Sequence, residues 1–409
     1  MPRPALLAAV LTAGLLSGTV QASPASDFYA AFEEALLGHY VSLHGADPVA
    51  VARTHREKLA EACRAGPGDC PVETAVTAVR AAVKDLNDAH VRLDAPRAGA
   101  RPLANPGAPG NVPPGYGWAL AHRQGAGLHV LAAVNPGGPA ARAGLARGDI
   151  LRAVDGNPDV AAALDRLRAA DGPVTVEVER AGRRIAATVA PAPGEGAPRP
   201  TLAWAGRTAV IHLPSCMNVE AGGQFRDAVA EAAAKGAAAI VMDLRDNRGG
   251  GFACAIAAGA FIDYDIVMTA KDGATRTLRV RRDHSSMEAD GEVETVPAGN
   301  PVRWDGPAAV LVNGLTASAA EAAAIEMKLT GRARVYGETT RGVGNNTVRP
   351  FPLPGGHTLF LSVTRHATPE GVPLPPSAQP DLPVTDDPVA GAAGRDAVLE
   401  AALEGLGRS

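Results

Sequence analysis

Apolar residues recur along the chain at two different periods, and the two periods separate it into regions. Between residues 71 and 87, valines and a leucine return every three or four positions, which predicts an amphipathic helix, and residues 25–62 are also expected to be helical. Further along, short apolar runs of strand length lead into Gly-rich turns and Ala-rich helical segments, at 208–213, 238–244 and 308–313. Strands that alternate with helices predict an α/β core in this part of the chain.

Segments rich in Pro, Gly and Ala separate these regions and indicate linkers. A polar stretch at 265–304 is expected to form a hairpin inserted into the core. The chain is therefore predicted to be a multidomain α+β protein with this organisation: a leader (1–22), an N-terminal helical part (23–94), a linker (95–114), a compact module (115–190), a second linker (191–200), an α/β core (201–388) and a C-terminal helix (389–409).

The first 22 residues have the pattern of a secretory signal peptide. Arg3 precedes a short apolar run, and small residues around Ala22 suggest cleavage after that position. The run is shorter than the ~20 residues needed to span a bilayer, although a retained anchor is the alternative. The mature protein is therefore expected to be periplasmic or secreted.

Export would permit disulfide bonds, and the chain has four cysteines. Cys63 and Cys70 flank a turn-rich hexapeptide, so a local bridge between them is expected. Cys216 and Cys254 could form a second bridge, but spacing alone does not decide this pairing. The cysteine spacing matches no zinc motif, and neither a metal nor an organic cofactor is expected.

Composition excludes two broad classes of protein. Of 409 residues, 46% are hydrophobic and 20% are charged, which argues against a disordered chain. The 39 basic and 43 acidic residues give a formal net charge of −4, and no basic stripe follows the sequence. A nucleic-acid partner is therefore not expected.

The module at 115–190 carries an informative run. Residues 135–156, N-P-G-G-P-A-A-R-A-G-L-A-R-G-D-I-L-R-A-V-D-G, resemble the signature of PDZ domains over its full length. The segment Gly115-Tyr116-Gly117-Trp118 sits where such domains keep their carboxylate-binding loop. The resemblance implies that backbone N–H groups there hold a peptide C-terminus while the peptide adds as a strand. Ordinary core packing is the alternative role for the two aromatic residues.

Two strand-to-helix junctions in the core could carry chemistry. Residues 243–252 read D-L-R-D-N-R-G-G-G-F, and N–H groups at a Gly-rich turn before a helix suit an oxyanion. Residues 313–321 read N-G-L-T-A-S-A-A-E, which places Ser318 in a first helical turn as a candidate nucleophile. The alternatives are a tight turn in the first case and helix capping by Thr316 or Ser318 in the second.

These two motifs are followed by G-E-T-T-R-G-V-G at 337–344, and by T-P-E-G and Q-P-D at 368–381. The ordered series, over residues 28–388, resembles the C-terminal processing, or tail-specific, serine peptidases. The resemblance implies a core of the ClpP/crotonase-like type. It also implies Ser318 as nucleophile, with the backbone N–H groups of Gly250 and Ala319 as the oxyanion hole.

The chain departs from this family at the general base. The family lysine belongs in G-K-G, but here the middle residue is Val343, which cannot accept a proton. The chain has only five lysines. Lys328 follows Ser318 on the same predicted helix at a separation of about 15 Å, too far for a hydrogen bond.

A histidine could replace the missing amine. Residues 88–90 form a D-A-H element that resembles the one supplying the catalytic histidine in tricorn-core and nisin-resistance peptidases. Imidazole suits a general base because its pKa lies near working pH, which makes His90 the predicted partner of Ser318. A surface or capping role is the alternative for His90. His366 is a reserve candidate, and His212 is expected to pack in the core. The group that orients the ring is left open between Asp88, Glu338 and Glu370.

The sequence therefore predicts an exported serine endopeptidase that recognises apolar polypeptide C-termini through its PDZ domain. A catalytically inactive peptide- or ligand-binding protein on a peptidase scaffold is the main alternative, since vertebrate retinoid-binding proteins resemble the same core. A Ser/His hydrolase of non-peptide esters is a third hypothesis, which the PDZ module disfavours.

Overall fold

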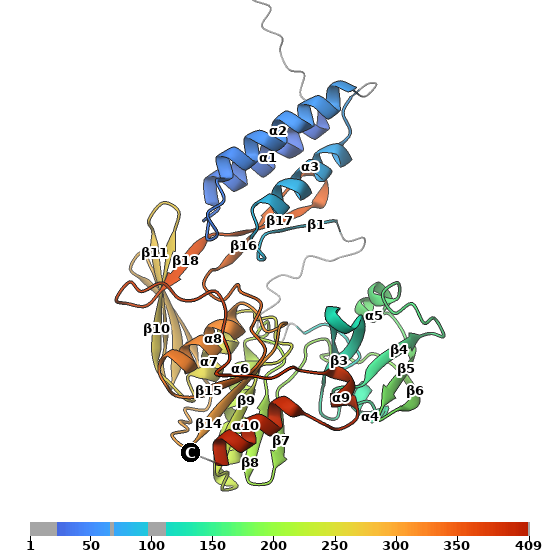
Figure 1. Cartoon of the computed structure of the whole chain (residues 1–409), viewed down its shortest axis with the longest axis vertical. Coiled ribbons are helices and arrows are strands. Elements are labelled where there is room, and N and C mark those ends of the chain that lie inside the picture. The colour runs from blue at the N-terminus through green and yellow to red at the C-terminus, as the bar shows by residue number, and fades with distance from the viewer. Residues whose placement is uncertain (1–22, 66–68, 97–111, 408–409) are drawn as a thin grey trace, which may run out of the picture.

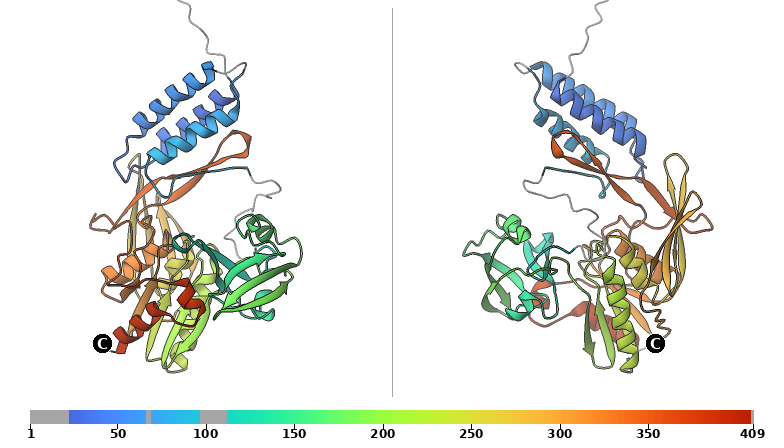
Figure 2. Two further views of the ribbon diagram at one scale, coloured as in Figure 1. Left: turned by 45° about the vertical axis from the view of Figure 1, so that its right-hand side comes forward. Right: turned by 180° about the vertical axis from the view of Figure 1, so that it is seen from behind.

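The computed structural model describes residues 23–65, 69–96 and 112–407 (Figure 1). The expected signal peptide lies outside these residues. Three units are visible: a helical cap, a five-stranded domain beside the centre, and a mixed core that carries the C-terminus (Figures 1 and 2). The predicted multidomain α+β class is confirmed. Within the described ranges, no helix is both long and apolar enough to cross a membrane.

Three helices form the cap: α1 (Pro24–His39), α2 (Pro48–Ala65) and α3 (Val72–Asp85). The prediction of a continuous helix over 25–62 is therefore wrong. The first helix ends where Tyr40 adopts an extended conformation, and Gly45 has a positive φ of 81°. Asp47 then accepts the N–H of Val49 just inside the next helix, which begins with Pro48. Proline at a first helical position loses no helical hydrogen bond, so the chain restarts there.

A small sheet completes the cap from two distant parts of the chain. Strand β1 (Arg92–Asp94) pairs with β17 (Thr358–Ser362), which pairs with β16 (Val348–Pro352). The last two strands fall within the range expected for the core. Leu359 and Leu361 of β17 are fully buried in the same apolar cluster as α1 and α3. The N-terminal helices therefore pack on strands contributed by the C-terminal half.

The module at 115–190 is a single antiparallel sheet in the order β2-β3-β4-β5-β6. Its alternating buried and exposed positions, as in Val174–Arg180, follow the two-residue period of a sheet with one buried face. The expected linker at 191–200 is also ordered against it, since Asn135 Nδ2 donates to Glu195 and to the carbonyl of Ala197. The elements are β2 (Trp118–Arg123), β3 (Leu128–Val134), α4 (Pro139–Arg142), β4 (Ile150–Val154), α5 (Leu164–Ala169), β5 (Val174–Arg180) and β6 (Arg183–Val189).

The core is built on a six-stranded sheet in the order β19-β15-β14-β9-β8-β7. Strands β8, β9, β14 and β15 are parallel, and β7 pairs antiparallel with β8 at one edge. The predicted apolar runs become three of these strands. The elements are β7 (Thr201–Ala205), β8 (Thr208–His212), α6 (Glu220–Ala234), β9 (Ala239–Asp243), α7 (Phe252–Ala258), β14 (Ala308–Val312), α8 (Ala319–Leu329), β15 (Arg334–Gly337), β19 (Leu382–Pro383), α9 (Pro388–Ala392) and α10 (Ala397–Gly407).

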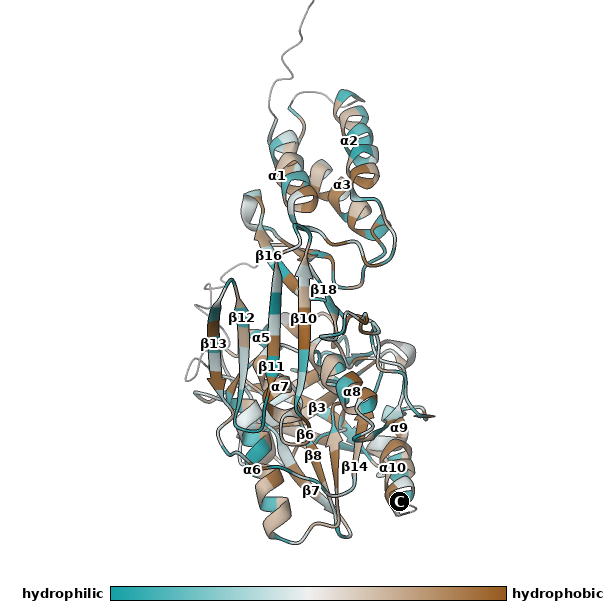
Figure 3. Cartoon of the chain, turned by 90° about the vertical axis from the view of Figure 1, so that its left-hand side faces the viewer, coloured by the Kyte–Doolittle hydropathy of each residue, from teal (hydrophilic) through white to brown (hydrophobic). Residues whose placement is uncertain are grey.

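Both faces of this sheet are covered. In β9, Ile240 and Met242 pack towards α6, α7 and α8, whereas Val241 packs towards α10 on the other face. Strands buried on both faces read as continuous apolar runs, which explains their clear sequence signal and their brown colour in Figure 3.

The polar stretch at 265–304 is a larger structure than the predicted hairpin. It forms four antiparallel strands, β10 (Tyr264–Ala270), β11 (Thr275–Val280), β12 (His284–Ala289) and β13 (Glu292–Pro297). A fifth strand, β18 (Thr364–Ala367), pairs with β10 and continues directly from β17 of the cap. The sequence pattern showed the local turns but not this strand, because β18 comes from nearly a hundred residues downstream. This second sheet therefore links the core to the cap.

Candidate active site

The two Gly- and Ser-containing motifs meet at one edge of the core sheet. They follow β9 and β14, which are parallel neighbours, so their carboxyl ends lie together. A Cβ atom placed on Gly249 would lie 2.8 Å from Ser318 Cβ and 2.9 Å from the Ala319 nitrogen. Only glycine allows this approach, and φ at Gly249 is 83°. The Gly-rich turn and the candidate nucleophile are therefore in direct contact.

The predicted oxyanion donors, Gly250 and Ala319, lie on the two sides of this contact. Gly250 has φ 142°, and its neighbours make the hydrogen bonds of a short parallel bridge to Cys216. Among the described residues, neither the Gly250 N–H nor the Ala319 N–H donates to a protein acceptor. Two free N–H groups beside a serine are the arrangement that stabilises a developing oxyanion.

Ser318 itself lies half-buried immediately before α8. Its backbone has φ 56° and ψ −124°, an unusual conformation for a residue with a side chain. Such strain is concentrated at functional sites. Its N–H donates to Glu321 Oε2 at 2.7 Å, and its side-chain oxygen accepts the backbone N–H of Glu321 in a capping box. Because the hydroxyl is the acceptor in that bond, its own proton stays available to a general base.

Glu321 is a residue whose role the sequence reasoning missed. Besides the Ser318 N–H, its buried carboxylate accepts hydrogen bonds from Thr340 Oγ1 (2.6 Å), Gly342 N–H (2.7 Å) and Val343 N–H (3.0 Å). Burial raises the pKa of Glu321, and these hydrogen bonds oppose that rise. The carboxylate thus ties the serine turn to the segment where the family carries its lysine. A glutamate three residues after a helix-capping serine is the available sequence signal.

The position of the family lysine is occupied by a buried valine. Val343 is 1% exposed. Lys328 is directed elsewhere, since its Nζ donates to the Gln379 carbonyl and pairs with Asp381 at 2.9 Å. Lys271 lines the same cavity as Ser318, but its Nζ donates to the Leu37 carbonyl of the cap, so neither lysine is hydrogen-bonded to the serine.

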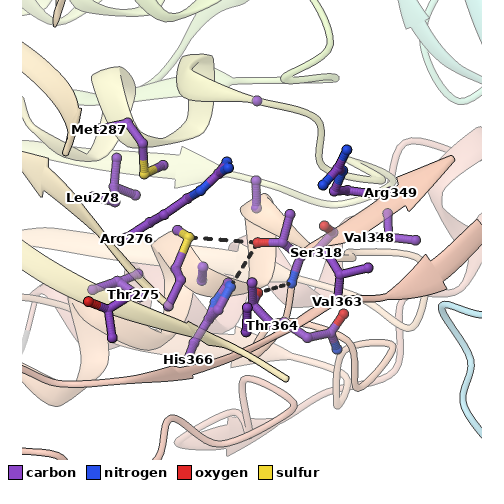
Figure 4. A pocket seen from close by; sticks show the side chains of 18 of the residues that line it. Thr275, Arg276, Leu278, Met287, Ser318, Val348, Arg349, Val363, Thr364 and His366 are labelled. Carbon is purple, nitrogen blue, oxygen red and sulfur yellow. Dashed lines mark hydrogen bonds between the residues drawn. The ribbon is translucent and has the colours of Figure 1, made fainter. Parts of the chain in front are cut away.

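A cavity of about 580 Å³ opens beside Ser318 and lies between α7, α8, the second sheet and the cap (Figure 4). Gly250, Ala319 and Ser318 are on its wall, and much of the remaining wall is apolar. The apolar residues come chiefly from α7 and from the second sheet: Phe252, Ala255, Tyr264, Ile266, Met268, Leu278 and Met287. Arg276 and Arg349 also line it.

His90 lies one side chain behind this cavity. Its Nδ1 is hydrogen-bonded to Asn346 Oδ1, and Asn346 is part of the cavity wall together with Ser318. Within the described chain, the His90 ring makes no hydrogen bond to the Ser318 hydroxyl. Burial lowers the pKa of His90 below its usual value, so the ring is neutral at neutral pH and able to accept a proton. Asn346 was not singled out from the sequence.

The reserve candidate His366 lies on the cavity wall itself (Figure 4). Its Nε2 is hydrogen-bonded to Thr347 Oγ1 at 3.0 Å. Burial, and then the neighbouring His90, lower the pKa of His366 to about 4. A histidine with so low a pKa is neutral but weakly basic, which makes it the poorer proton acceptor. His212 is the buried last residue of β8, and its Nε2 lies 3.3 Å from the Arg245 carbonyl oxygen.

The three candidates for orienting His90 lie in different places. Asp88 Oδ1 accepts the backbone N–H of His90 at 2.9 Å, and its charge raises the ring's pKa. Glu338 instead accepts the N–H groups of Gly314 and Asp386, and Glu370 is exposed. Among the described residues, the hydrogen bond recorded for the ring is the one to Asn346.

The predicted peptide-binding loop of the PDZ-like module is partly engaged already. The N–H groups of Gly115 and Gly117 donate to the carbonyls of Ala192 and Glu195. Tyr116 is 2% exposed and donates its hydroxyl to Gly172, and its ring lies 4.9 Å from that of Trp118. The strand that follows, β2, is at the edge of its sheet, so one side of it has no strand neighbour among the described residues.

Ion pairs join this module to the motif that carries the oxyanion turn. Arg147 pairs with Asp243 at 2.8 Å, and Arg123 pairs with Asp246 at 2.9 Å. Asp243 is fully buried, and its contacts with Arg147 and Arg245 hold its pKa well below the usual range despite the burial. The described residues contain no cluster of His, Cys, Asp and Glu suited to a metal ion.

The site combines a serine at the start of a helix, nearby N–H groups without a protein acceptor, and an adjacent cavity. This combination is typical of serine hydrolases. Residues 207–384 match the model of peptidase family S41, and residues 130–180 match the PDZ domain model. The chain is 32% identical over 264 residues to carboxyl-terminal-processing peptidase 2, chloroplastic, of Arabidopsis thaliana, which covers 60% of this chain and 47% of that protein. It is 29% identical over 292 residues to the chloroplastic C-terminal processing peptidase of Tetradesmus obliquus, covering 64% and 57%.

The fold is similar to that of the photosystem II D1 C-terminal processing protease, with a TM-score of 0.52 over 91% of this chain and 97% of that chain at 22% identity. Residues 207–384 therefore match peptidase family S41 and residues 130–180 match a PDZ domain, and the chain is similar to C-terminal processing peptidases. The aligned segments span about half the length of the two chloroplastic relatives.

Proposed function

We propose that the protein is an exported serine endopeptidase that cleaves polypeptides with Ser318 as nucleophile. The observation that carries this proposal is the contact between the Gly-rich turn and Ser318, where a Cβ on Gly249 would lie within 2.9 Å of the Ala319 nitrogen. This contact supports an oxyanion hole formed by the N–H groups of Gly250 and Ala319 beside the Ser318 hydroxyl. Export is supported by the N-terminal pattern and by the disulfides Cys63–Cys70 and Cys216–Cys254.

His90 is the general base of this proposal. It takes the proton of the Ser318 hydroxyl as the oxygen attacks the peptide carbonyl, and the tetrahedral oxyanion accepts hydrogen bonds from Gly250 and Ala319. The proton then passes to the leaving amine, and water hydrolyses the acyl-enzyme by the reverse route. Catalytic hydrogen bonds are often unformed without substrate, and the proposal requires that the His90 ring reach the Ser318 hydroxyl when substrate is bound.

Substrate recognition is proposed at two places. The free edge of β2 would take a polypeptide C-terminus as an added strand, and the apolar cavity would take a substrate side chain next to the scissile bond. Its lining residues Ile266, Met268 and Met287 are uncharged and flexible enough to suit large aliphatic side chains. The expected substrates are therefore unfolded or tailed polypeptides with an apolar C-terminus.

A fluorophosphonate probe tests the nucleophile directly. Such a probe should label the purified native protein at Ser318, and the Ser318→Ala variant should neither be labelled nor cleave an unfolded protein with an apolar tail. Thr316→Ala is the matched control, because its hydroxyl donates to Leu244 within the fold rather than lining the cavity. Cleavage that persists in Ser318→Ala would remove Ser318 as nucleophile.

The main alternative is a binder without catalysis, and the specific observation that favours it is the buried Val343 at the position of the family lysine. A native protein that binds apolar-tailed peptides but is not labelled at Ser318 and cleaves no polypeptide would establish this alternative. The same labelling experiment therefore decides between the two functions.

A further inference from the structure

The disulfide between Cys216 and Cys254 lies against the candidate oxyanion turn. The Cys216 N–H donates to the Gly249 carbonyl at 3.0 Å, and the Gly251 N–H donates to the Cys216 carbonyl at 2.8 Å. Between these two bonds, a Cβ on Gly250 would lie 2.3 Å from the Cys216 carbonyl carbon. The backbone of one half-cystine is therefore the surface on which Gly250 rests.

The other half-cystine lies on the helix that continues from the turn. Helix α7 begins at Phe252, directly after Gly251, and Cys254 is in its first turn. The disulfide thus links the Cys216 segment, which contacts the turn, to α7, the helix that follows the turn. Both residues are buried, with Cys216 1% and Cys254 0% exposed.

The supporting segment has little regular structure of its own. Residues 213–219 connect β8 to α6 without a helix or strand, and Met217 is 58% exposed. Asn247 also joins this segment to the turn: its Nδ2 donates to the Leu213 carbonyl and its Oδ1 accepts the Gly249 N–H, both at 2.8 Å. Besides such hydrogen bonds, the disulfide is the covalent constraint on this segment's position.

We propose that the Cys216–Cys254 disulfide is a positioning element of the oxyanion hole: it holds the Cys216 segment so that the Gly250 N–H stays aimed at the site beside Ser318. This inference rests on the proposed function. An oxyanion donor works only within a few tenths of an ångström of its proper position. If its support could move, the stabilisation of the transition state would decrease more than the affinity for substrate. Because both sulfur atoms are buried, the role is tested with variants rather than with a reductant.

The test compares two disulfide-free variants. C216A/C254A removes the bridge at the turn, and C63A/C70A removes the bridge of the cap, so each loses one disulfide. Assayed well below their unfolding midpoints, C216A/C254A should lose about 10- to 100-fold in kcat with KM changed less than about twofold, and C63A/C70A should keep its kcat within about twofold. C216A/C254V, which refills the lost volume, should not restore kcat if the covalent link is what matters.

Hydrogen–deuterium exchange of residues 247–251 provides a readout that does not depend on catalysis. Exchange there should be about tenfold faster in C216A/C254A than in the native protein and unchanged in C63A/C70A, because the bonds to Cys216 open more often. Unchanged exchange together with unchanged kcat would overturn the proposal, as would recovery of kcat in C216A/C254V. If the native protein is not labelled at Ser318, the proposed function is refuted. If exchange is nevertheless faster in C216A/C254A than in the native protein, the disulfide still supports the turn.

Discussion

The two halves of the candidate site are built in different ways. The nucleophile half comes from two neighbouring parallel strands, and Gly249, Ser318 and Glu321 hold one another through short backbone and side-chain contacts. The base half comes from the cap, where His90 precedes β1 and meets Asn346 of a segment more than two hundred residues away. One half is therefore fixed within a single sheet edge, whereas the other depends on how the cap is seated. On the proposed function, the serine side is preformed and the cap completes the site.

The largest expected effect is at the base half. His90→Ala should lower kcat by about 10³-fold because the serine loses its proton acceptor. His366→Gln is the matched control, since it keeps a hydrogen-bonding side chain beside Thr347, and kcat should then change less than about threefold. Steady-state kinetics on a tailed unfolded protein measures both. If His366→Gln removed activity and His90→Ala did not, the base would be His366. Nucleophile and base would then both line the cavity, and the cap would supply neither.

The next effect is at the nucleophile half. Gly250→Ala should lower kcat by about 100-fold, because φ is 142° and the new Cβ would meet the Cys216 carbonyl carbon at 2.3 Å, which displaces the N–H. Gly251→Ala is its matched control, since a Cβ there has open space and φ is −115°. Equal activity in the two variants would show that the turn is not a preformed oxyanion site.

A smaller effect concerns the orientation and protonation of His90. Asn346→Ala should reduce kcat by about tenfold through a misplaced ring. The pH profile sharpens this expectation. The base must be neutral, and the pKa of His90 is lowered, so native kcat/KM should fall only below pH 6.5. Asn346→Asp adds an anion beside the ring, favours the imidazolium and should move this acidic limb to higher pH by about one unit. A limb that stays in place would show that His90 does not set the profile.

The smallest effect is on stability within the nucleophile half. Glu326 lies on α8, the same helix as Ser318, and burial raises its pKa to about 7. The folded protein then retains a proton that the unfolded chain releases, so stability falls as pH rises from about 4.5 to 7. Glu326→Gln should raise the free energy of unfolding by about 1–3 kcal/mol at pH 8 and change little at pH 4. Denaturant unfolding measures this, with Glu294→Gln as the exposed control. Equal effects at both pH values would contradict the assignment.

Much of the nucleophile half was predictable because its parts are local. Apolar runs at 208–213, 238–244 and 308–313 indicated buried strands, and the residues after two of them indicated the turn and the serine. Parallel strands place such residues at one edge, so the contact between Gly249 and Ser318 follows from the fold class. Glu321 was visible as a capping pattern but not as the tie to Thr340 and Val343, since that tie spans separate loops.

The base half could be named from the sequence but not placed. The D-A-H element indicated His90 by resemblance, yet neither Asn346 nor the β1–β17 pairing has a local pattern that reveals it. The break between α1 and α2 and the addition of β18 to the second sheet were missed for the same reason, because longer-range packing overrode the local pattern.

By itself, the sequence determined the order of the units, the buried strands and the identity of the serine turn, since periodicity, turn glycines and capping residues act over a few positions. The tertiary structure alone decided which distant segments meet: β16 and β17 under the cap, Asn346 against His90, and Cys216 against Gly250. The physical reason is that such contacts gain their energy from burial and hydrogen bonding between segments far apart in the chain, and no local pattern records the partner.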